Sequence, residues 1–293
     1  MSDILVRAMI NGELAVCACN LSEMVEEARV THDTLPVGTI ILGRTIAAGT
    51  MMASMLKSKN DKLTLMLNGG GPAGSIIAVG DAQLHMKAYI ANPKVNTPPN
   101  DKGGFNIADA VGKDGFVTVV KDLGLKEPYI GKTPIVSGEI GEDVANYLLT
   151  SEQQPSIVYV NTWLETDMSV VNAGGIILRP MPGCSEETLE AIEQRVPEIS
   201  NFAMYMFADT TENVLKKIFD GLALDILDTQ KPLLQCDCSK ERLEQVVVSL
   251  GRKEIQDMID KDDGAEIVCR FCNKKYWFDA QKLADLLKQA TKE

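Results

Sequence analysis

The sequence predicts an α+β protein with a mostly antiparallel N-terminal sheet domain, an acidic helical linker and a small C-terminal metal-binding domain. Three observations carry this prediction. Six short β-type runs follow one another between residues 63 and 178, the charge balance changes near residue 180, and four of the seven cysteines come after residue 235. The 293 residues are 45% hydrophobic and 24% charged, which is ordinary globular composition.

The first domain, expected over residues 1–180, begins with local signals for one strand and two helices. Apolar alternation over Glu13–Cys19 (ELAVCAC) indicates a strand. Ser22 is a candidate N-cap for a helix through His32, because its side-chain oxygen can accept a backbone N–H of the first turn. Apolar residues at helical spacing predict a second helix over Gly43–Lys57.

The β-type runs that follow are bounded by Gly, Pro and Asn, which is typical of strands joined by tight turns. They are LTLML (63–67), SIIAV (75–79), LHMKAYI (84–90), FVTVV (116–120), SIVYV (156–160) and SVVNAGGIIL (169–178). A helix is expected between the fourth and fifth runs, over residues 138–153. Short, turn-linked runs favour a mostly antiparallel sheet.

Residues 181–230 form the predicted linker. They hold ten acidic and three basic residues, and apolar residues recur at helical spacing. Ser185 and Asp209 are candidate N-caps, with Glu212 completing a capping box, and Pro197 interrupts the helices. Such amphipathic helices either cap the first domain permanently or are held weakly enough to detach.

Residues 231–293 form the third predicted domain, in which twelve basic and twelve acidic residues balance. Ser239 is the expected N-cap of a helix over residues 240–250, which Gly251 ends. A short helix over residues 253–259 follows. The run AEIVCRFCNKKYWF (265–278) alternates as a hairpin with CRFC at its tip, and a last helix is expected over residues 280–289.

The four late cysteines have the spacing of a metal site. They form C-x-C, thirty intervening residues and then C-x-x-C, and are Cys236, Cys238, Cys269 and Cys272. Four thiolates around one ion make a closed, structural zinc site. Asn273 tolerates the left-handed backbone that follows many such C-x-x-C turns, whereas the C-x-C pair requires Asp237 to sit in a turn.

A metal matters here because the C-terminal segment is small. Chains of this size rely on a metal or another cross-link for stability. Structural zinc contributes an apparent ~10–16 kcal/mol in small zinc-binding peptides, which is comparable to the about 5–15 kcal/mol that stabilises an ordinary domain. Oxidants attack zinc-bound thiolates, so the sequence predicts a fold that oxidation can dismantle.

At this point the chain resembles the redox-regulated heat-shock holdase family, the bacterial thirty-three-kilodalton heat-shock proteins, over essentially its whole length. The most specific stretch is CDCSKERLEQVVVSLGRKEIQDMID…CRFCNKKYWF. Supporting stretches are NGGGPAG, VTVVKDLG, IVSGEIGEDVANYLLTSEQQPS and AGGIILRPMPG.

The resemblance implies an ATP-independent chaperone that is inactive when reduced, with one zinc ion held by the four late cysteines. It implies that oxidation and mild unfolding release the zinc and form the disulfides Cys236–Cys238 and Cys269–Cys272. The switch domain and linker then loosen, and the exposed apolar surface captures unfolding proteins, with homodimerisation assisting. Cys17, Cys19 and Cys184 fall outside the family's switch.

Several other signals have simpler explanations. The spacing Gly69-x-Gly71-x-x-Gly74 matches a dinucleotide-binding fingerprint, but the following run is another strand, so a hairpin turn is expected. His32 and His85, the only histidines, are expected to be structural.

The remaining cysteines and a methionine group also have a structural and a functional interpretation. Cys17 and Cys19 share one strand face and are expected to be small buried side chains. Cys184 is either a bystander or a reactive thiol. Core packing is the default for Met51, Met52 and Met55, with an adaptable client-binding surface as the alternative.

Location and partners are constrained by composition. The longest apolar stretch, Thr45–Leu56, is shorter than the roughly 18 to 20 residues a bilayer requires, and the N-terminus lacks the pattern of a signal peptide. We therefore expect a cytoplasmic protein without a membrane partner. Clustered cysteines in a reducing cytosol indicate metal or redox chemistry.

Three function classes compete. A chaperone, which is not an enzyme, is preferred. A zinc-ribbon nucleic-acid-binding protein is disfavoured because the chain carries a net charge of −12, and residues 231–293 a net charge of zero. A thiol–disulfide oxidoreductase is disfavoured because the C-x-x-C of such enzymes begins a helix, whereas the C-x-x-C of this sequence is expected on a hairpin.

Overall fold

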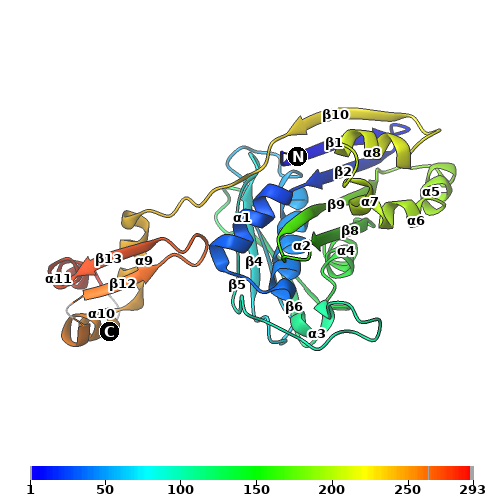
Figure 1. Ribbon diagram of the computed structural model, residues 1–293. Helices are drawn as coiled ribbons and strands as arrows, with labels where there is room; N and C mark the ends of the chain where they lie inside the picture. The colour runs from blue at the N-terminus through cyan, green and yellow to red at the C-terminus, as the bar shows by residue number, and fades with distance from the viewer. Residues whose placement is uncertain (1, 263, 291–293) are drawn as a thin grey trace. The chain divides into compact units, whose positions relative to one another are not determined.

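The computed structural model describes residues 2–262 and 264–290, and these form two compact units that divide between Gln235 and Cys236 (Figure 1). The division falls five residues later than the domain limit predicted at residue 231. The reason is strand β11 (Leu233–Leu234), which pairs in parallel with β5 of the first unit and so ties the chain to that unit. Each unit is described by itself.

The first unit contains a five-stranded sheet that is antiparallel throughout. Its strands, in spatial order, are β10 (Leu224–Gln230), β1 (Ile4–Ile10), β2 (Leu14–Asn20), β9 (Val170–Pro180) and β8 (Ile157–Leu164). Side chains alternate strictly along β2, where Cys17 and Cys19 face one core and Val16 and Ala18 face the other. Both faces of this sheet are therefore buried.

A second sheet of six strands is antiparallel except for the β11–β5 pair. Its strands, in spatial order, are β11, β5 (His85–Ile90), β4 (Ile76–Asp81), β3 (Lys62–Asn68), β6 (Phe116–Asp122) and β7 (Tyr129–Pro134). Helices α3 (Ile107–Val111) and α4 (Gly141–Thr150) lie in the connections before β6 and after β7. All six predicted runs are strands, but they divide between two sheets, whereas one sheet was expected.

Helix α2 (Pro36–Ala53) packs between the two sheets, and α1 (Ser22–His32) packs beside it (Figure 1). Sixteen of the eighteen residues of α2 are buried, so it is apolar on all sides. Gly43 permits α2 to lie close to Thr162 in the five-stranded sheet, since a Cβ at residue 43 would lie 2.4 Å from Thr162 Oγ1. The prediction of Gly43–Lys57 placed this helix too late. A helix that is apolar on all sides shows no change in hydrophobic periodicity at its first residue, and it is Pro36 that marks the N-terminus.

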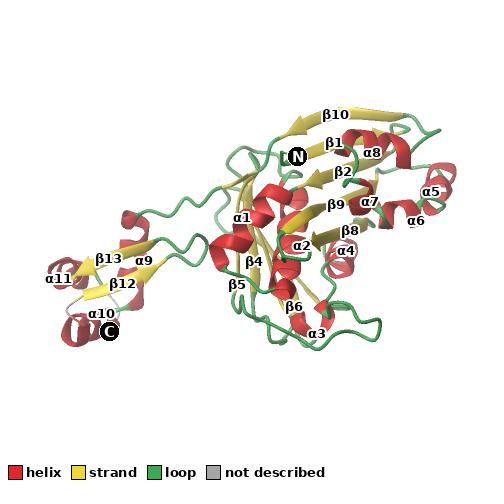
Figure 2. Ribbon diagram, viewed as in Figure 1, coloured by secondary structure: helices red, strands yellow, loops and turns green. Residues whose placement is uncertain are grey.

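The predicted linker packs on the other face of the five-stranded sheet. Its helices, red in Figure 2, are α5 (Glu186–Glu193), α6 (Val196–Ser200), α7 (Phe202–Tyr205) and α8 (Thr211–Ile218). Phe202, Met206 and Phe219 are buried among sheet residues such as Val6 and Ile176. The linker also supplies β10, an edge strand that the expected helices did not include.

Two predicted N-caps were displaced. Ser22 is the first residue of α1, and the carboxylate of Asp3 accepts the backbone N–H groups of Glu23 and Met24 in its place. Thr210, one residue after the predicted Asp209, caps α8. Each error arises because a neighbouring oxygen reaches the same orphan N–H groups.

The second unit is small and contains helices α9 (Lys240–Leu250), α10 (Arg252–Asp262) and α11 (Ala280–Gln289) around the hairpin of β12 (Gly264–Val268) and β13 (Lys275–Asp279). The structure confirms the predicted cap at Ser239, the end at Gly251 and the full extent of the last helix. Its described buried core holds six side chains: Val247, Ile255, Phe278, Leu283, Leu286 and Ala290.

Candidate metal centre

The structure brings the four predicted cysteines together. Their Sγ atoms all lie within 4.8 Å of one another. Cys236 Sγ is 3.7 Å from Cys269 Sγ, and Cys238 Sγ is 3.4 Å from Cys272 Sγ. Cys269 is buried and the other three are partly buried. The pair that precedes α9 therefore meets the pair at the tip of the β12–β13 hairpin.

The hairpin tip is held by backbone hydrogen bonds. The Cys269 N–H donates to the Lys274 carbonyl over 2.9 Å, and the Asn273 N–H donates to the Cys269 carbonyl over 2.8 Å. Asn273 has φ of 55°, which confirms its predicted left-handed backbone. This turn directs the side chains of Cys269 and Cys272 to the same point.

The first pair of cysteines lies in the irregular segment between β11 and α9. The Asp237 carboxylate accepts a hydrogen bond from the Arg242 guanidinium, and Ser239 Oγ accepts the Arg242 N–H over 3.3 Å. These bonds join the segment to the first turn of α9. They let the Cys236 and Cys238 side chains converge, whereas an extended strand would place them on one face but about 7 Å apart.

Tyr276, on β13, is the residue that sequence reasoning missed. Its Oη lies 3.3 Å from Cys238 Sγ and 3.2 Å from the Cys238 carbonyl oxygen, within hydrogen-bond distance of both acceptors. The available signal was an aromatic residue with a hydroxyl four positions after the C-x-x-C. That spacing alone does not predict that the Tyr276 side chain reaches the cysteines. The prediction also requires the pairing register of β12 and β13.

The surroundings of the cluster shift the pKa values of Cys236, Cys238 and Cys272 in different directions. Burial raises the pKa of Cys236 and of Cys272. Burial also opposes ionisation of Cys238, but hydrogen bonds with Tyr276 and the other thiols outweigh it and lower the pKa of Cys238 to about 7. The cluster thus favours a thiolate at Cys238 with neighbouring thiols directed at it.

This donor set fits a tetrahedral metal ion. Sulfurs placed about 2.3 Å from a central zinc lie about 3.8 Å apart, and the two measured sulfur–sulfur distances are 3.7 and 3.4 Å. Four soft thiolates suit zinc rather than a hard cation. With all four positions filled by protein, such a site would be structural and would leave no position for a substrate.

The other motifs have structural roles. Gly69, Gly71 and Gly74 lie in the β3–β4 hairpin connection, as expected. His32 is buried with Nε2 2.9 Å from the Ala88 carbonyl oxygen, and His85 Nδ1 lies 3.0 Å from the Asp81 carboxylate.

The three remaining cysteines lie outside the cluster. Cys17 and Cys19 are buried in β2, and burial raises the pKa of Cys17 to about 11 and that of Cys19 as well. Burial and the Glu13 carboxylate raise the pKa of Cys184, which favours the bystander interpretation of that thiol. Met51 and Met52 are buried in the core as expected, whereas Met55 is partly exposed.

None of the helices in the described residues is both long and apolar enough to cross a membrane.

Comparison with known proteins gives a consistent result. A family model described as Hsp33 protein matches residues 3–279. The 33 kDa chaperonin of Clostridioides difficile (strain 630) is 42% identical over 293 residues, covering 99% of this chain and 100% of its own length. That of Alkaliphilus metalliredigens (strain QYMF) is 40% identical over 289 residues, covering 98% of this chain and 99% of its own length. The crystal structure of the 33 kDa chaperonin (heat shock protein 33 homolog) from Thermotoga maritima matches with a TM-score of 0.89 and 32% identity, covering 98% of each chain.

Proposed function

The chain belongs to the Hsp33 family and is a chaperone, not an enzyme, and from this we propose that it is a redox-regulated, ATP-independent holdase. In this proposal the protein is inactive while reduced and holds one zinc ion through Cys236, Cys238, Cys269 and Cys272. Oxidation under stress converts it to a form that binds unfolding proteins.

One observation carries the proposal: four sulfurs from two segments, thirty residues apart in the chain, converge within 4.8 Å. When bound, zinc would supply the cross-link between these segments. The core of the second unit has six buried side chains, which is small for independent stability. The four thiolates therefore hold the segment before α9 against the hairpin.

Oxidation removes the donors in pairs. Two thiols give one disulfide with the loss of two electrons and two protons, and one hydrogen peroxide takes these up to become two waters. The proposed pairs, Cys236–Cys238 and Cys269–Cys272, each lie within one segment. They leave the two segments unconnected, so the second unit loses its cross-link.

The alternative pairing would have the opposite effect. Cys236 with Cys269 and Cys238 with Cys272 would join the same two segments covalently, and those sulfurs are already 3.7 and 3.4 Å apart. After peroxide treatment at raised temperature, we expect peptide mapping by mass spectrometry to find the within-segment pairs, together with suppression of client aggregation without ATP. Cross-segment pairs in an active protein would contradict the proposed switch.

A second element of the proposal is the release of residues 181–230 from the five-stranded sheet. Their buried side chains cover apolar residues of that sheet, so detachment would expose two complementary apolar surfaces. The division into residues 1–180, 181–230 and 231–293 is thus proposed as functional: a stable platform, a releasable cover and a sensor.

Weakening the cover is expected to activate the protein without oxidant. Phe202 is fully buried, and truncating a buried Phe to Ala costs about 3–5 kcal/mol. Reduced Phe202→Ala should lose hydrogen-exchange protection in α5–α8 and suppress aggregation partially. Tyr205→Ala, on the same helix but 38% exposed, is the matched control and should behave like wild type. If Phe202→Ala kept its hydrogen-exchange protection in α5–α8 and stayed inactive, release of this segment would not be the step that activates the protein.

Tyr276 is expected to protect the proposed site. Its hydroxyl bonds the Cys238 sulfur, and partners that orient a ligand typically change metal affinity 10–100-fold when removed. At a fixed peroxide concentration, Tyr276→Phe should release zinc about tenfold faster, followed with a chromogenic chelator. Tyr129→Phe, which removes a hydroxyl bonded to Ser151 in the first unit, should release it at the wild-type rate. Equal rates for both variants would rule out this role.

The partners follow from the same proposal. Unfolded client proteins are the ligands, a homodimer is the active form, and neither nucleic acid nor a membrane is a partner. The proposed location is the cytoplasm, where reducing conditions keep the cysteines as thiols. A salt-dependent gel shift with RNA, or insulin reduction by the protein, would instead support one of the two competing classes.

A further inference from the structure

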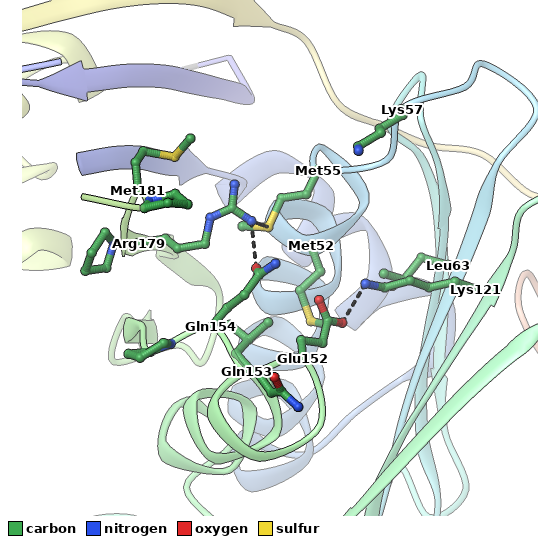
Figure 3. A pocket seen from close by; sticks show the side chains of 14 residues that line it. Met52, Met55, Lys57, Leu63, Lys121, Glu152, Gln153, Gln154, Arg179 and Met181 are labelled. Atoms are coloured by element: carbon green, nitrogen blue, oxygen red, sulfur yellow. Dashed lines mark hydrogen bonds and ion pairs between the residues drawn. The ribbon is translucent and has the colours of Figure 1, made fainter. Parts of the chain in front are cut away.

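A cavity of about 700 Å³ in the first unit has no role in the switch described above. It lies where the end of α2, strands β3 and β6, the loop after α4 and the end of β9 meet (Figure 3). Its volume is in the range of ordinary ligand sites. Met181 and Pro182, the first residues of the predicted linker, form part of its wall.

The cavity is positively charged in a strongly acidic protein. Lys57, Lys121 and Arg179 line it together with a single carboxylate, Glu152. Lys121 and Glu152 pair with each other at 2.5 Å. This leaves a formal excess of two positive charges, although the whole chain has a net charge of −12. A positive cavity in a negative protein concentrates the field on an incoming anion.

Two of the cations have no carboxylate partner among the described residues. Arg179 donates from Nη1 to the neutral Gln154 side chain over 2.9 Å, and the same nitrogen lies 3.8 Å from the Met55 sulfur. Lys57 is exposed at the edge of the cavity. An arginine in this situation retains donors that suit a carboxylate in bidentate geometry.

The remaining lining is apolar and adaptable. Met52, Met55 and Met181 contribute flexible thioether side chains, and Figure 3 shows Met52 and Met55 between Arg179 and Lys121. Methionine surfaces accommodate apolar groups of different shapes. Gln153 and Gln154 add amide groups at one wall. Amide groups form hydrogen bonds with peptide N–H and C=O groups, but they form none with a hydrocarbon chain.

We propose that this cavity binds an acidic side chain, flanked by apolar residues, in an unfolded polypeptide segment. The carboxylate pairs with Arg179 and Lys57, and the apolar neighbours lie on the methionines. Because Met181 helps to form the wall and its N–H donates to the Glu13 carbonyl over 2.8 Å, the cavity is complete while the linker is docked. The reduced protein therefore binds a short acidic–apolar segment at this cavity, whereas the capture of whole unfolding proteins requires the apolar surfaces that oxidation exposes. This inference rests on the chaperone function, but not on the redox switch.

The test is a binding cycle on the reduced, full-length protein by calorimetry. The probes are a short blocked peptide with a central Glu between leucines and the same peptide with Gln. Wild type should bind the Glu peptide about tenfold more tightly, which corresponds to about 1.4 kcal/mol. In Arg179→Gln the two peptides should bind about equally well, and in Lys57→Gln the preference for the Glu peptide should fall to about threefold. Lys113→Gln, an exposed cation outside the cavity, should keep the full preference.

Three outcomes would overturn the proposal. They are an unchanged preference in both Arg179→Gln and Lys57→Gln, binding by the oxidised protein alone, and displacement of the Glu peptide by dodecanoate at lower concentrations than the peptide itself needs. Lys57 is exposed, so Lys57→Gln keeps the test valid if Arg179→Gln folds poorly. Failure here would leave oxidation-dependent suppression of aggregation intact, whereas failure of the switch would leave the Glu preference in place.

Discussion

Removing the metal from the reduced protein is expected to unfold the second unit and leave the first unit folded. The described core of the second unit has six buried side chains. Structural zinc contributes an apparent ~10–16 kcal/mol, which matches the about 5–15 kcal/mol of a whole domain. Hydrogen exchange after chelation should therefore show α9–α11 and the β12–β13 hairpin losing protection, with little change in either sheet of the first unit.

Adding zinc back to the chelated protein is the control, and it should restore protection in the same segments. The contradicting result is a second unit that stays protected after its zinc content falls to zero. In that case its apolar core would be sufficient, and loss of the ion could not act as a switch.

Replacing one ligand is expected to activate the protein without oxidant. Cys269 is the buried member of the cluster, and its backbone is fixed by the hairpin turn. In Cys269→Ser three thiolates remain, so the site should lose most of its zinc affinity. Purified under reducing conditions, the variant should contain less than stoichiometric zinc and suppress the aggregation of a thermally unfolding client.

Cys184→Ser is the matched control, because Cys184 lies outside the cluster and its thiol donates to the Ser185 carbonyl oxygen over 3.8 Å. It should retain zinc and remain inactive until oxidised. If Cys269→Ser instead kept its full complement of metal and stayed inactive, the four-sulfur site would not be the element that holds the protein in its resting state.

The second unit could be predicted almost completely from the sequence because its signals are local. The caps at Ser239 and Gly251 determine α9, alternation determines the hairpin, and Asn273 has the backbone that its chemistry allows. The cluster followed from cysteine spacing, since a C-x-x-C at a hairpin tip has few other uses. Tyr276 escaped prediction because its contact with Cys238 depends on the exact register of β12 and β13.

The first unit was predicted less well because its sheets depend on distant pairing. Strand β1 pairs with β10, and Leu5 lies opposite Gln230, so no local pattern indicates that these segments meet. Strand β7 is largely exposed and carries little hydrophobic signal. Helix α2 is buried on every side, so its apolar residues lack the period that marks the start of an amphipathic helix.

The most direct test of the central claim follows zinc content and client light scattering in one titration with peroxide at raised temperature. The proposal predicts that the reduced protein starts with one zinc per chain and no suppression. The two signals should then change together, with full suppression once the zinc is lost. Suppression that develops while the zinc stays bound, or a reduced protein that contains no zinc and is inactive, would contradict it.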